Sequence, residues 1–293
     1  MNFKSLSKII DNSALDLFQL LKLLVYFLLL INFVLYVRLD WEIASYTMRN
    51  GGSLLDWTRA FATTIDESAW IILIILFELE TYVLSDDFFS GLRAKLLHGV
   101  RYICYGFLVH SLYAFGIYVY ELSVATAIAD ISDLCQLAGE GISFATNLVY
   151  TDLDPANCAI LSNASQFFYT DPPEFIIVTD EPGLVIELQL AWVDFLEVVV
   201  WLAILFTIEL GIRLQDRSIT RGMLIKALTW AKIMLYTLLW GGIFYWLYRG
   251  HFMFAWDEFV WIAGFVAIES NMAIWRQEID EADGVNTAPA DPI

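Results

Sequence analysis

The stretch Leu17–Val37 constrains the fold most, because it places a single charge in a long, mostly apolar run (LFQLLKLLVYFLLLINFVLYV). A helix needs about 20 mostly apolar residues to cross the hydrocarbon of a bilayer. The one charge, Lys22, lies near the start of the run, where a long side chain can reach the headgroups. Basic residues precede the run and no small-residue cleavage site follows it, so we predict a retained signal anchor.

Composition extends this prediction to the whole chain. The protein is 59% hydrophobic and 17% charged, whereas a soluble domain is usually about 25% charged. Five further apolar stretches favour spanning helices, although the second and sixth are short and interrupted by acids. The six predicted spans are Leu17–Val37, Ser68–Leu84, Tyr102–Tyr120, Leu190–Ile212, Leu228–Tyr248 and Phe259–Trp275.

The distribution of charge predicts the orientation. With the N-terminus in the cytoplasm, twelve of the sixteen Lys and Arg residues fall on the cytoplasmic side. Residues 121–190 contain eleven Asp or Glu and no Lys, Arg or His. We therefore predict a multi-pass protein of a bacterial inner membrane, with both termini cytoplasmic and residues 121–189 periplasmic or extracellular.

These features define an all-α polytopic membrane protein with a small α+β domain between the third and fourth spans. Residues 1–120 hold the first three spans and an amphipathic interfacial helix near 53–65, which a Ser53 cap would begin. Residues 121–189 form the acidic outer domain, and 190–276 hold the last three spans. Residues 277–293 are acidic and are predicted to be a disordered cytoplasmic tail.

The outer domain holds the two cysteines Cys135 and Cys158, and the third, Cys104, lies in a predicted span. Two cysteines in an oxidising compartment favour a disulfide, and two buried free thiols are the alternative. Further along, FIIVT and LVIEL flank Asp-Glu-Pro-Gly at 180–183, which predicts a β-hairpin with a type II turn.

The even-numbered spans share a pattern in which a Trp precedes an inner Glu by eight positions. Spans 2–3 and 4–5 would then form a parallel internal repeat, with span 6 resembling spans 2 and 4. In span 2 the inner acid is Glu78 by this spacing and Glu80 by the similarity of the surrounding residues. The inner acids are Glu78 or Glu80, Glu209 and Glu269, and the acids nearer the outer mouth are Asp66, Glu67, Asp194, Glu197, Asp257 and Glu258.

An ionised carboxylate deep in a bilayer is costly, so each inner acid should be protonated, paired or in contact with water. Three hypotheses follow. The acids line an ion or proton path; they pair with basic residues, Arg101 with Glu78 or Glu80 and Lys232 with Glu209; or the helices are shifted and the acids lie at the headgroups.

The sequence therefore leads to two functional hypotheses. The first is a small cation or proton channel or transporter, in which the outer acids concentrate cations and the chain forms a homo-oligomer. The alternative is a non-transporting sensor or accessory subunit whose outer domain binds a partner. No motif indicates an enzyme, a cofactor or a metal site, and the few basic residues do not indicate a nucleic-acid partner. The bilayer itself is the one partner that the composition requires.

Overall fold

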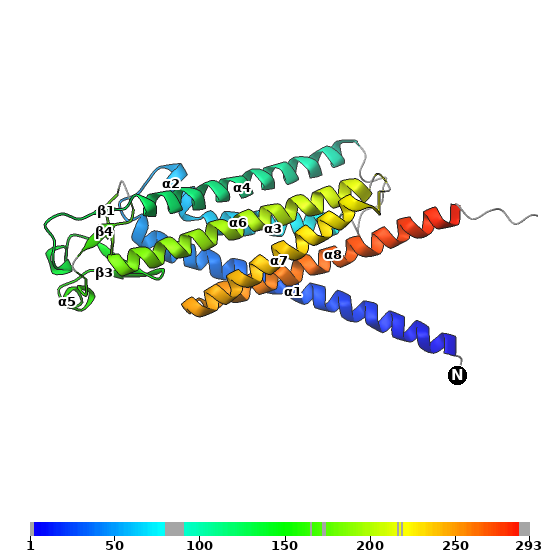
Figure 1. Cartoon of the computed structure of the whole chain (residues 1–293), viewed down its shortest axis with the longest axis horizontal. Coiled ribbons are helices and arrows are strands. Elements are labelled where there is room, and N and C mark those ends of the chain that lie inside the picture. Colours follow the sequence, from blue (N-terminus) through cyan, green and yellow to red (C-terminus); the bar gives the residue numbers. More distant parts are fainter. Residues whose placement is uncertain are drawn as a thin grey trace, which may run out of the picture. The chain divides into compact units, whose positions relative to one another are not determined.

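The computed structural model describes residues 3–79, 91–164, 166–171, 174–215, 217 and 219–286, and it consists of long helices with one small sheet (Figure 1). The helices are α1 (Phe3–Thr47), α2 (Leu54–Ala60), α3 (Ala62–Glu78), α4 (Gly91–Ser123), α5 (Cys158–Leu161), α6 (Glu181–Gln215), α7 (Met223–Arg249) and α8 (Phe252–Asn286), with a 3-10 turn, η3, at Leu134–Gln136. The strands are β1 (Thr126–Ala127), β2 (Ser143–Thr146), β3 (Val149–Asp152), β4 (Phe167–Tyr169) and β5 (Ile177–Asp180).

Among the described residues, four helical segments are long and apolar enough to cross a membrane. They are Gln19–Thr47 within α1, Lys95–Ser123 within α4, and the whole of α6 and α7. The pair α2 and α3 also qualifies if it counts as one span, although the two helices are bent by 71° at their junction. The structure thus supports four or five of the six predicted spans, because α8 is a long helix but does not meet the same criterion.

Contacts divide the chain into two compact units. One comprises Met1–Asn32, Ile74–Ser90 and Val200–Ile293, and the other comprises Phe33–Leu73 and Gly91–Val199. Helices α1, α3 and α6 have residues in both units.

The predicted helix near 53–65 is present, but it is broken into α2 and the start of α3. Ser53 begins α2 with a capping box: its Oγ accepts the Asp56 N–H, and Asp56 accepts the Ser53 N–H at 2.8 Å. Past the break, the Asp40 carboxylate of α1 accepts both the N–H and the hydroxyl of Thr64, at 2.8 and 2.7 Å. Asp40 thereby satisfies a donor in the first turn of α3 that has no partner within the helix.

The predicted hairpin at 180–183 is wrong, because α6 begins at Glu181 and contains the whole LVIEL segment. Asp180 Oδ1 accepts the Gly183 N–H at 2.7 Å, as an N-cap residue does. Pro182 lacks an N–H and suits the first turn of a helix. A Cβ on Gly183 would lie 2.2 Å from Thr179 Oγ1, so the close approach of β5 to α6 requires glycine.

The sheet of the outer domain has the strand order β1-β4-β5-β2-β3. All neighbouring pairs are antiparallel except β2 and β5, which are parallel. Its core consists of Leu134, Leu137, Ile142, Phe144, Leu153, Cys158, Phe167 and Val178. The structure joins Cys135 to Cys158, with their Cα atoms 4.8 Å apart, which confirms the predicted disulfide.

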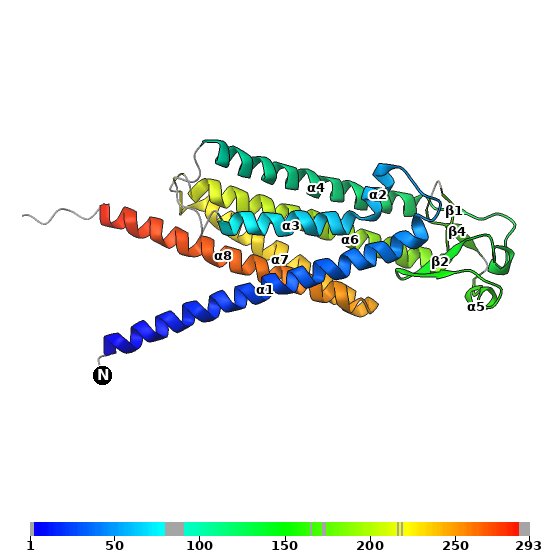
Figure 2. The ribbon, with the colours of Figure 1, turned by 180° about the vertical axis from the view of Figure 1, so that it is seen from behind.

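Helices α7 and α8 form a tight antiparallel hairpin and lie side by side in both views (Figures 1 and 2). Gly250 ends α7 in the left-handed region, with φ of 84°. His251 N–H then donates to the Trp246 carbonyl, as in a Schellman motif. Although disorder was predicted from residue 277, α8 is helical as far as Asn286, and residues 287–293 lie outside the described residues.

Candidate functional site

The inner glutamate of α3 is held by two residues of α1. Lys22 Nζ lies 2.6 Å from Glu78 Oε2, and Tyr26 Oη donates to Glu78 Oε1 at 2.5 Å. The lysine and glutamate side chains are 11% and 18% exposed, so the pair is mostly shielded. Lys22 and Tyr26 are four residues apart and therefore share one face of α1.

The inner glutamate of α8 is held in the same way by α7. Lys232 Nζ pairs with Glu269 Oε2, and Tyr236 Oη donates to Glu269 Oε1 at 3.1 Å. These two charged side chains are 18% and 21% exposed. We call the two clusters the inner sites: Lys22, Tyr26 and Glu78 form the first, and Lys232, Tyr236 and Glu269 form the second.

The inner sites decide part of what the sequence left open. Glu78 forms the ion pair in span 2, and Glu80 lies outside the described residues. Lys232, predicted to face Glu209, pairs with Glu269 instead. Arg101 and Glu209 lie on α4 and α6, and both are half-buried and interact with other groups. The predicted pairing of Arg101 with Glu78 or Glu80 stays a prediction. Lys22 binds Glu78, although we expected it to reach the headgroups.

The acids nearer the outer mouth differ from one another. Asp257 accepts the Asn32 amide N–H at 2.8 Å, and Glu258 accepts the indole N–H of Trp201 at 3.2 Å. Both carboxylates are buried, as is Glu67. Asp66, Asp194 and Glu197 are half-buried. Asp257 and Glu258 are therefore hydrogen-bonded by polar side chains that the sequence did not predict as their partners.

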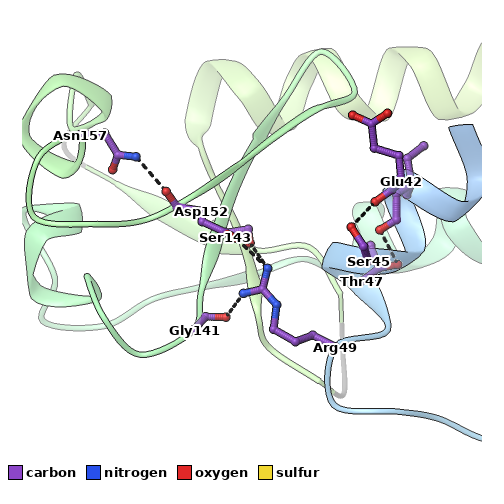
Figure 3. Close-up of polar contacts among 9 residues, drawn as sticks. Glu42, Ser45, Thr47, Arg49, Gly141, Ser143, Asp152 and Asn157 are labelled. Carbon is purple, nitrogen blue, oxygen red and sulfur yellow. Dashed lines mark hydrogen bonds and ion pairs between the residues drawn. The ribbon is translucent and has the colours of Figure 1, made fainter.

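A second cluster connects the end of α1 to the outer sheet (Figure 3). The Arg49 guanidinium donates to the Gly141 carbonyl at 2.8 Å and to Asp152 Oδ1 at 2.6 Å. It also reaches Ser143 Oγ at 3.3 Å, and Ser143 donates to Asp152 at 2.7 Å. The Ser143 and Arg49 hydrogen bonds lower the pKa of Asp152. We call Arg49, Gly141, Ser143 and Asp152 the Arg49 clasp.

The turn between β2 and β3 is tied to α6. Asn147 and Leu148 have φ of 52° and 59°, which suits a two-residue hairpin turn but is unfavourable for leucine. The Leu148 N–H donates to Glu187 at 3.0 Å, and the Glu187 side chain is 2% exposed. In β3, burial first and the Glu187 charge second raise the pKa of Tyr150, which therefore stays neutral. Its ring stacks on Tyr46 of α1 at 5.6 Å.

Asp171 of the outer domain is a partly buried carboxylate with a raised pKa. Asp171 accepts the N–H groups of Ile176 and Ile177 at 3.0 and 2.9 Å, and so closes the connection between β4 and β5. Burial nevertheless raises the pKa of Asp171 to about 6, because desolvation outweighs those hydrogen bonds.

Comparison with known proteins identifies no relative: no protein-family model, curated protein or solved structure matches this chain. The class is therefore defined by the fold itself, a helical protein with several potential membrane-spanning helices and a small disulfide-linked sheet domain.

The sequence predictions did not include Tyr26, Tyr236, Asn32 or Arg49 as site residues. A usable signal existed for the two tyrosines, since each follows a lysine by four positions and so shares its helix face. No comparable local signal exists for Arg49, whose contacts lie 92, 94 and 103 residues away.

Proposed function

We propose that this chain is a non-transporting membrane protein, a sensor or accessory subunit whose acidic outer domain binds a partner. The observation that carries this proposal is the neutralisation of Glu78 and Glu269. Each of these carboxylates is held by a lysine and a tyrosine of a neighbouring helix. A carboxylate that is paired in this way links two helices. Its negative charge is already compensated by the lysine, so it would bind a transported cation only weakly.

The contacts of the outer domain support the same proposal. The Arg49 clasp and the Tyr46–Tyr150 stack connect the sheet to α1, and the Leu148–Glu187 hydrogen bond connects it to α6. A partner that displaces the β2–β3 hairpin would therefore act directly on two long helices. Residues 121–190 carry no basic residue, so a partner with a basic surface fits best.

The proposal includes the predicted arrangement in the membrane: six spans in a bacterial inner membrane, cytoplasmic termini, and an outer domain in the periplasm. Cysteine labelling in intact cells tests it, with the exposed positions Glu140→Cys and Ile219→Cys on a Cys104→Ser background. An impermeant reagent should label position 140 at once and position 219 only after permeabilisation. The reverse order would overturn the orientation.

Transport is tested with liposomes. We expect purified protein to conduct protons, Na⁺ and K⁺ no faster than empty liposomes. A flux that exceeds the empty control and falls in Glu78→Gln and Glu269→Gln would refute the non-transporting proposal. Photo-crosslinking from Ile160, which is 72% exposed, tests partner binding independently. The absence of any specific adduct from Ile160 and from Val149 in intact cells would count against a partner.

Cation or proton transport is the second candidate, and buried carboxylates favour it. Glu67, Asp257 and Glu258 are 5%, 6% and 7% exposed, and buried acids in spanning helices commonly mark proton or ion routes. With transport, Glu78, Glu80, Glu209 and Glu269 would line the inner half of the route, and a homo-oligomer could enclose it.

A further inference from the structure

Strand β3 forms an exposed edge of the outer sheet. In the strand order β1-β4-β5-β2-β3 it is an end strand, and among the described residues only β2 pairs with it. All four of its residues are at least partly exposed, whereas β2 and β5 are mostly buried. The opposite end strand, β1, has two residues and offers a shorter edge. β3 is therefore the place where this sheet can best be extended.

The register of the β2–β3 hairpin determines which backbone groups face outwards. The Leu153 N–H donates to the carbonyl of the residue that precedes β2. In an antiparallel ladder, residues that exchange hydrogen bonds with the partner strand alternate with residues that do not. Thr151 and Val149 therefore bond to β2, and the N–H and carbonyl groups of Tyr150 and Asp152 point away from it.

One of these outward groups is already used inside the domain. The Asp152 carbonyl accepts the side-chain amide of Asn157 at 2.8 Å. Within the described part of the chain, the Tyr150 N–H and carbonyl and the Asp152 N–H have no hydrogen-bond partner. Such groups on an edge strand are a template for pairing with another chain. An added strand would thus be centred on Tyr150.

The side chains of β3 determine what an added strand should carry. Asp152 lies on the sheet face that Arg49 contacts (Figure 3), and its side chain remains 63% exposed. Val149 lies on the other face and is 59% exposed. Side chains on neighbouring strands lie about 5 Å apart. A segment with a basic residue beside Asp152 and an apolar residue beside Val149 would therefore match both faces.

Charge argues against a second copy of this chain on the same edge. Residues 121–190 contain eleven Asp or Glu and no Lys, Arg or His. Two outer domains placed edge to edge would repel one another, whereas a basic segment would be attracted.

We propose that β3 receives an extended segment of a partner protein as a sixth strand of the sheet, and that this segment alternates basic and apolar residues. Backbone hydrogen bonds to Tyr150 and Asp152 supply the affinity, and the contacts with Asp152 and Val149 supply the specificity. This inference rests on the proposed function, because it names the kind of partner segment that the outer domain binds. The added strand lies beside the Arg49 clasp, and hence beside the contact that holds the sheet to the end of α1.

Peptide binding tests the chemistry of the edge. The probe is a fluorescent peptide that alternates Lys and Val, measured by anisotropy against the full-length protein in nanodiscs of zwitterionic lipid. We expect saturable binding that is at least about tenfold tighter than for a peptide that alternates Glu and Val. No binding of the Lys-Val peptide, or equal affinity for both peptides, would overturn the inference.

Two matched variants separate the edge from general charge attraction. Val149→Lys and Ile160→Lys each replace an exposed apolar residue of the outer domain, so the net charge changes equally. Val149→Lys puts the new charge on the edge and should weaken binding of the Lys-Val peptide about tenfold. Ile160→Lys puts it on α5 and should have a much smaller effect. Equal losses in the two variants would show that the peptide responds to charge alone, against the proposal.

N-methylated peptides test the backbone hydrogen bonds without altering the protein. In a strand, the N–H groups of alternate residues point to opposite edges. Methylation of all Lys nitrogens therefore blocks one edge of the peptide, and methylation of all Val nitrogens blocks the other. One methylated peptide should lose binding and the other should keep it. Equal affinities of the two would exclude strand addition.

Photo-crosslinking in intact cells keeps this inference separate from the proposed function. Adducts from Ile160 that persist in Val149→Lys, together with failure of the peptide tests, would retain a partner and refute β3 as its binding site. The absence of adducts from both Ile160 and Val149 in the wild type would refute the partner itself. Dimers of the full-length protein that dissociate in Val149→Lys would assign the edge to a second copy and overturn the inference.

Discussion

Lys22 Nζ lies 2.6 Å from Glu78 Oε2, although 56 residues separate the two in the chain. This ion pair joins α1 to α3 and leaves neither charge uncompensated in an apolar region. Lys232 and Glu269 repeat the arrangement between α7 and α8. Tertiary contacts thus turn four charged residues, which the hydrocarbon of a membrane disfavours, into links between helices.

The tyrosines of the inner sites should contribute to stability separately from the lysines. Tyr26→Phe and Tyr236→Phe each remove a hydrogen bond to a charged carboxylate while keeping the ring. We expect each to lose about 1–2 kcal/mol, measured as a shift of the unfolding midpoint in detergent. Tyr248→Phe is the matched control, because Tyr248 is 82% exposed on α7. Equal midpoints in all three variants would contradict a role for the hydroxyls.

Asp171 should make the outer domain more stable as the pH falls from 7 to 4. Its pKa is raised to about 6, whereas that of an unfolded chain is 3.8, so the folded state binds the proton more tightly. The stabilisation is fully present below pH 3.8 and is lost as the pH rises towards 6. We expect about 1–2 kcal/mol after allowing for the exposed part of the side chain.

Thermal unfolding between pH 4.5 and 7.5 checks this, and Asp171→Asn should flatten the dependence. Asp152 is the useful comparison because its pKa is lowered. The ionised Asp152 carboxylate stabilises the folded state. This stabilisation is lost only when the pH falls below the ordinary pKa of an aspartate and Asp152 becomes protonated. A midpoint that rises steadily with pH in the wild type would show that Asp171 does not dominate.

The Arg49 clasp should hold the outer sheet locally and contribute little to global stability. The charged side chains of Arg49 and Asp152 are 32% and 63% exposed, and exposed ion pairs contribute about 0–1 kcal/mol. We expect Arg49→Gln to speed amide hydrogen exchange in peptides covering residues 141–152 and to leave the unfolding midpoint nearly unchanged. Arg38→Gln changes an exposed arginine on α1, the helix that precedes Arg49, and should leave exchange in those peptides unaltered.

Helix α2 should lie in the outer interface of the bilayer. Leu54 and Trp57 are 82% and 36% exposed, and Arg59 on the same helix pairs with Glu121 at 2.6 Å. The basic residue of α2 thus contacts an acid of the protein itself. The exposed apolar side chains of α2 remain available to contact lipid. A spin label at Leu54→Cys should be accessible to oxygen and shielded from a water-soluble nickel complex.

The matched control for α2 is a label at Ile160→Cys, which is 72% exposed on α5 of the outer domain. That label should be accessible to the nickel complex. Equal nickel accessibility at both positions would place α2 in water. Shielding of position 54 from both oxygen and nickel would indicate that a protein covers it.

The sequence by itself determined the long apolar helices, the capped start of α2 and the disulfide. Each follows from local composition or spacing: Leu17–Val37 is long enough to span a bilayer whatever surrounds it, and Ser53 and Asp56 satisfy each other within one turn. The error at 180–183 was local too. Asp-Glu-Pro-Gly suits a β-turn and the first turn of a helix equally, and the close packing of Gly183 on Thr179 selects the helix.

The tertiary structure alone decided which base neutralises which acid and how the outer sheet holds the helices. The packing of α1 on α3 brings Lys22 and Tyr26 to Glu78, and the packing of α7 on α8 brings Lys232 to Glu269. Likewise, α1 ends where Arg49 reaches Asp152 across 103 residues. Spacing along one helix fixes which side chains share a face, whereas the partner of that face depends on how separate helices pack, and helix periodicity carries no information about that.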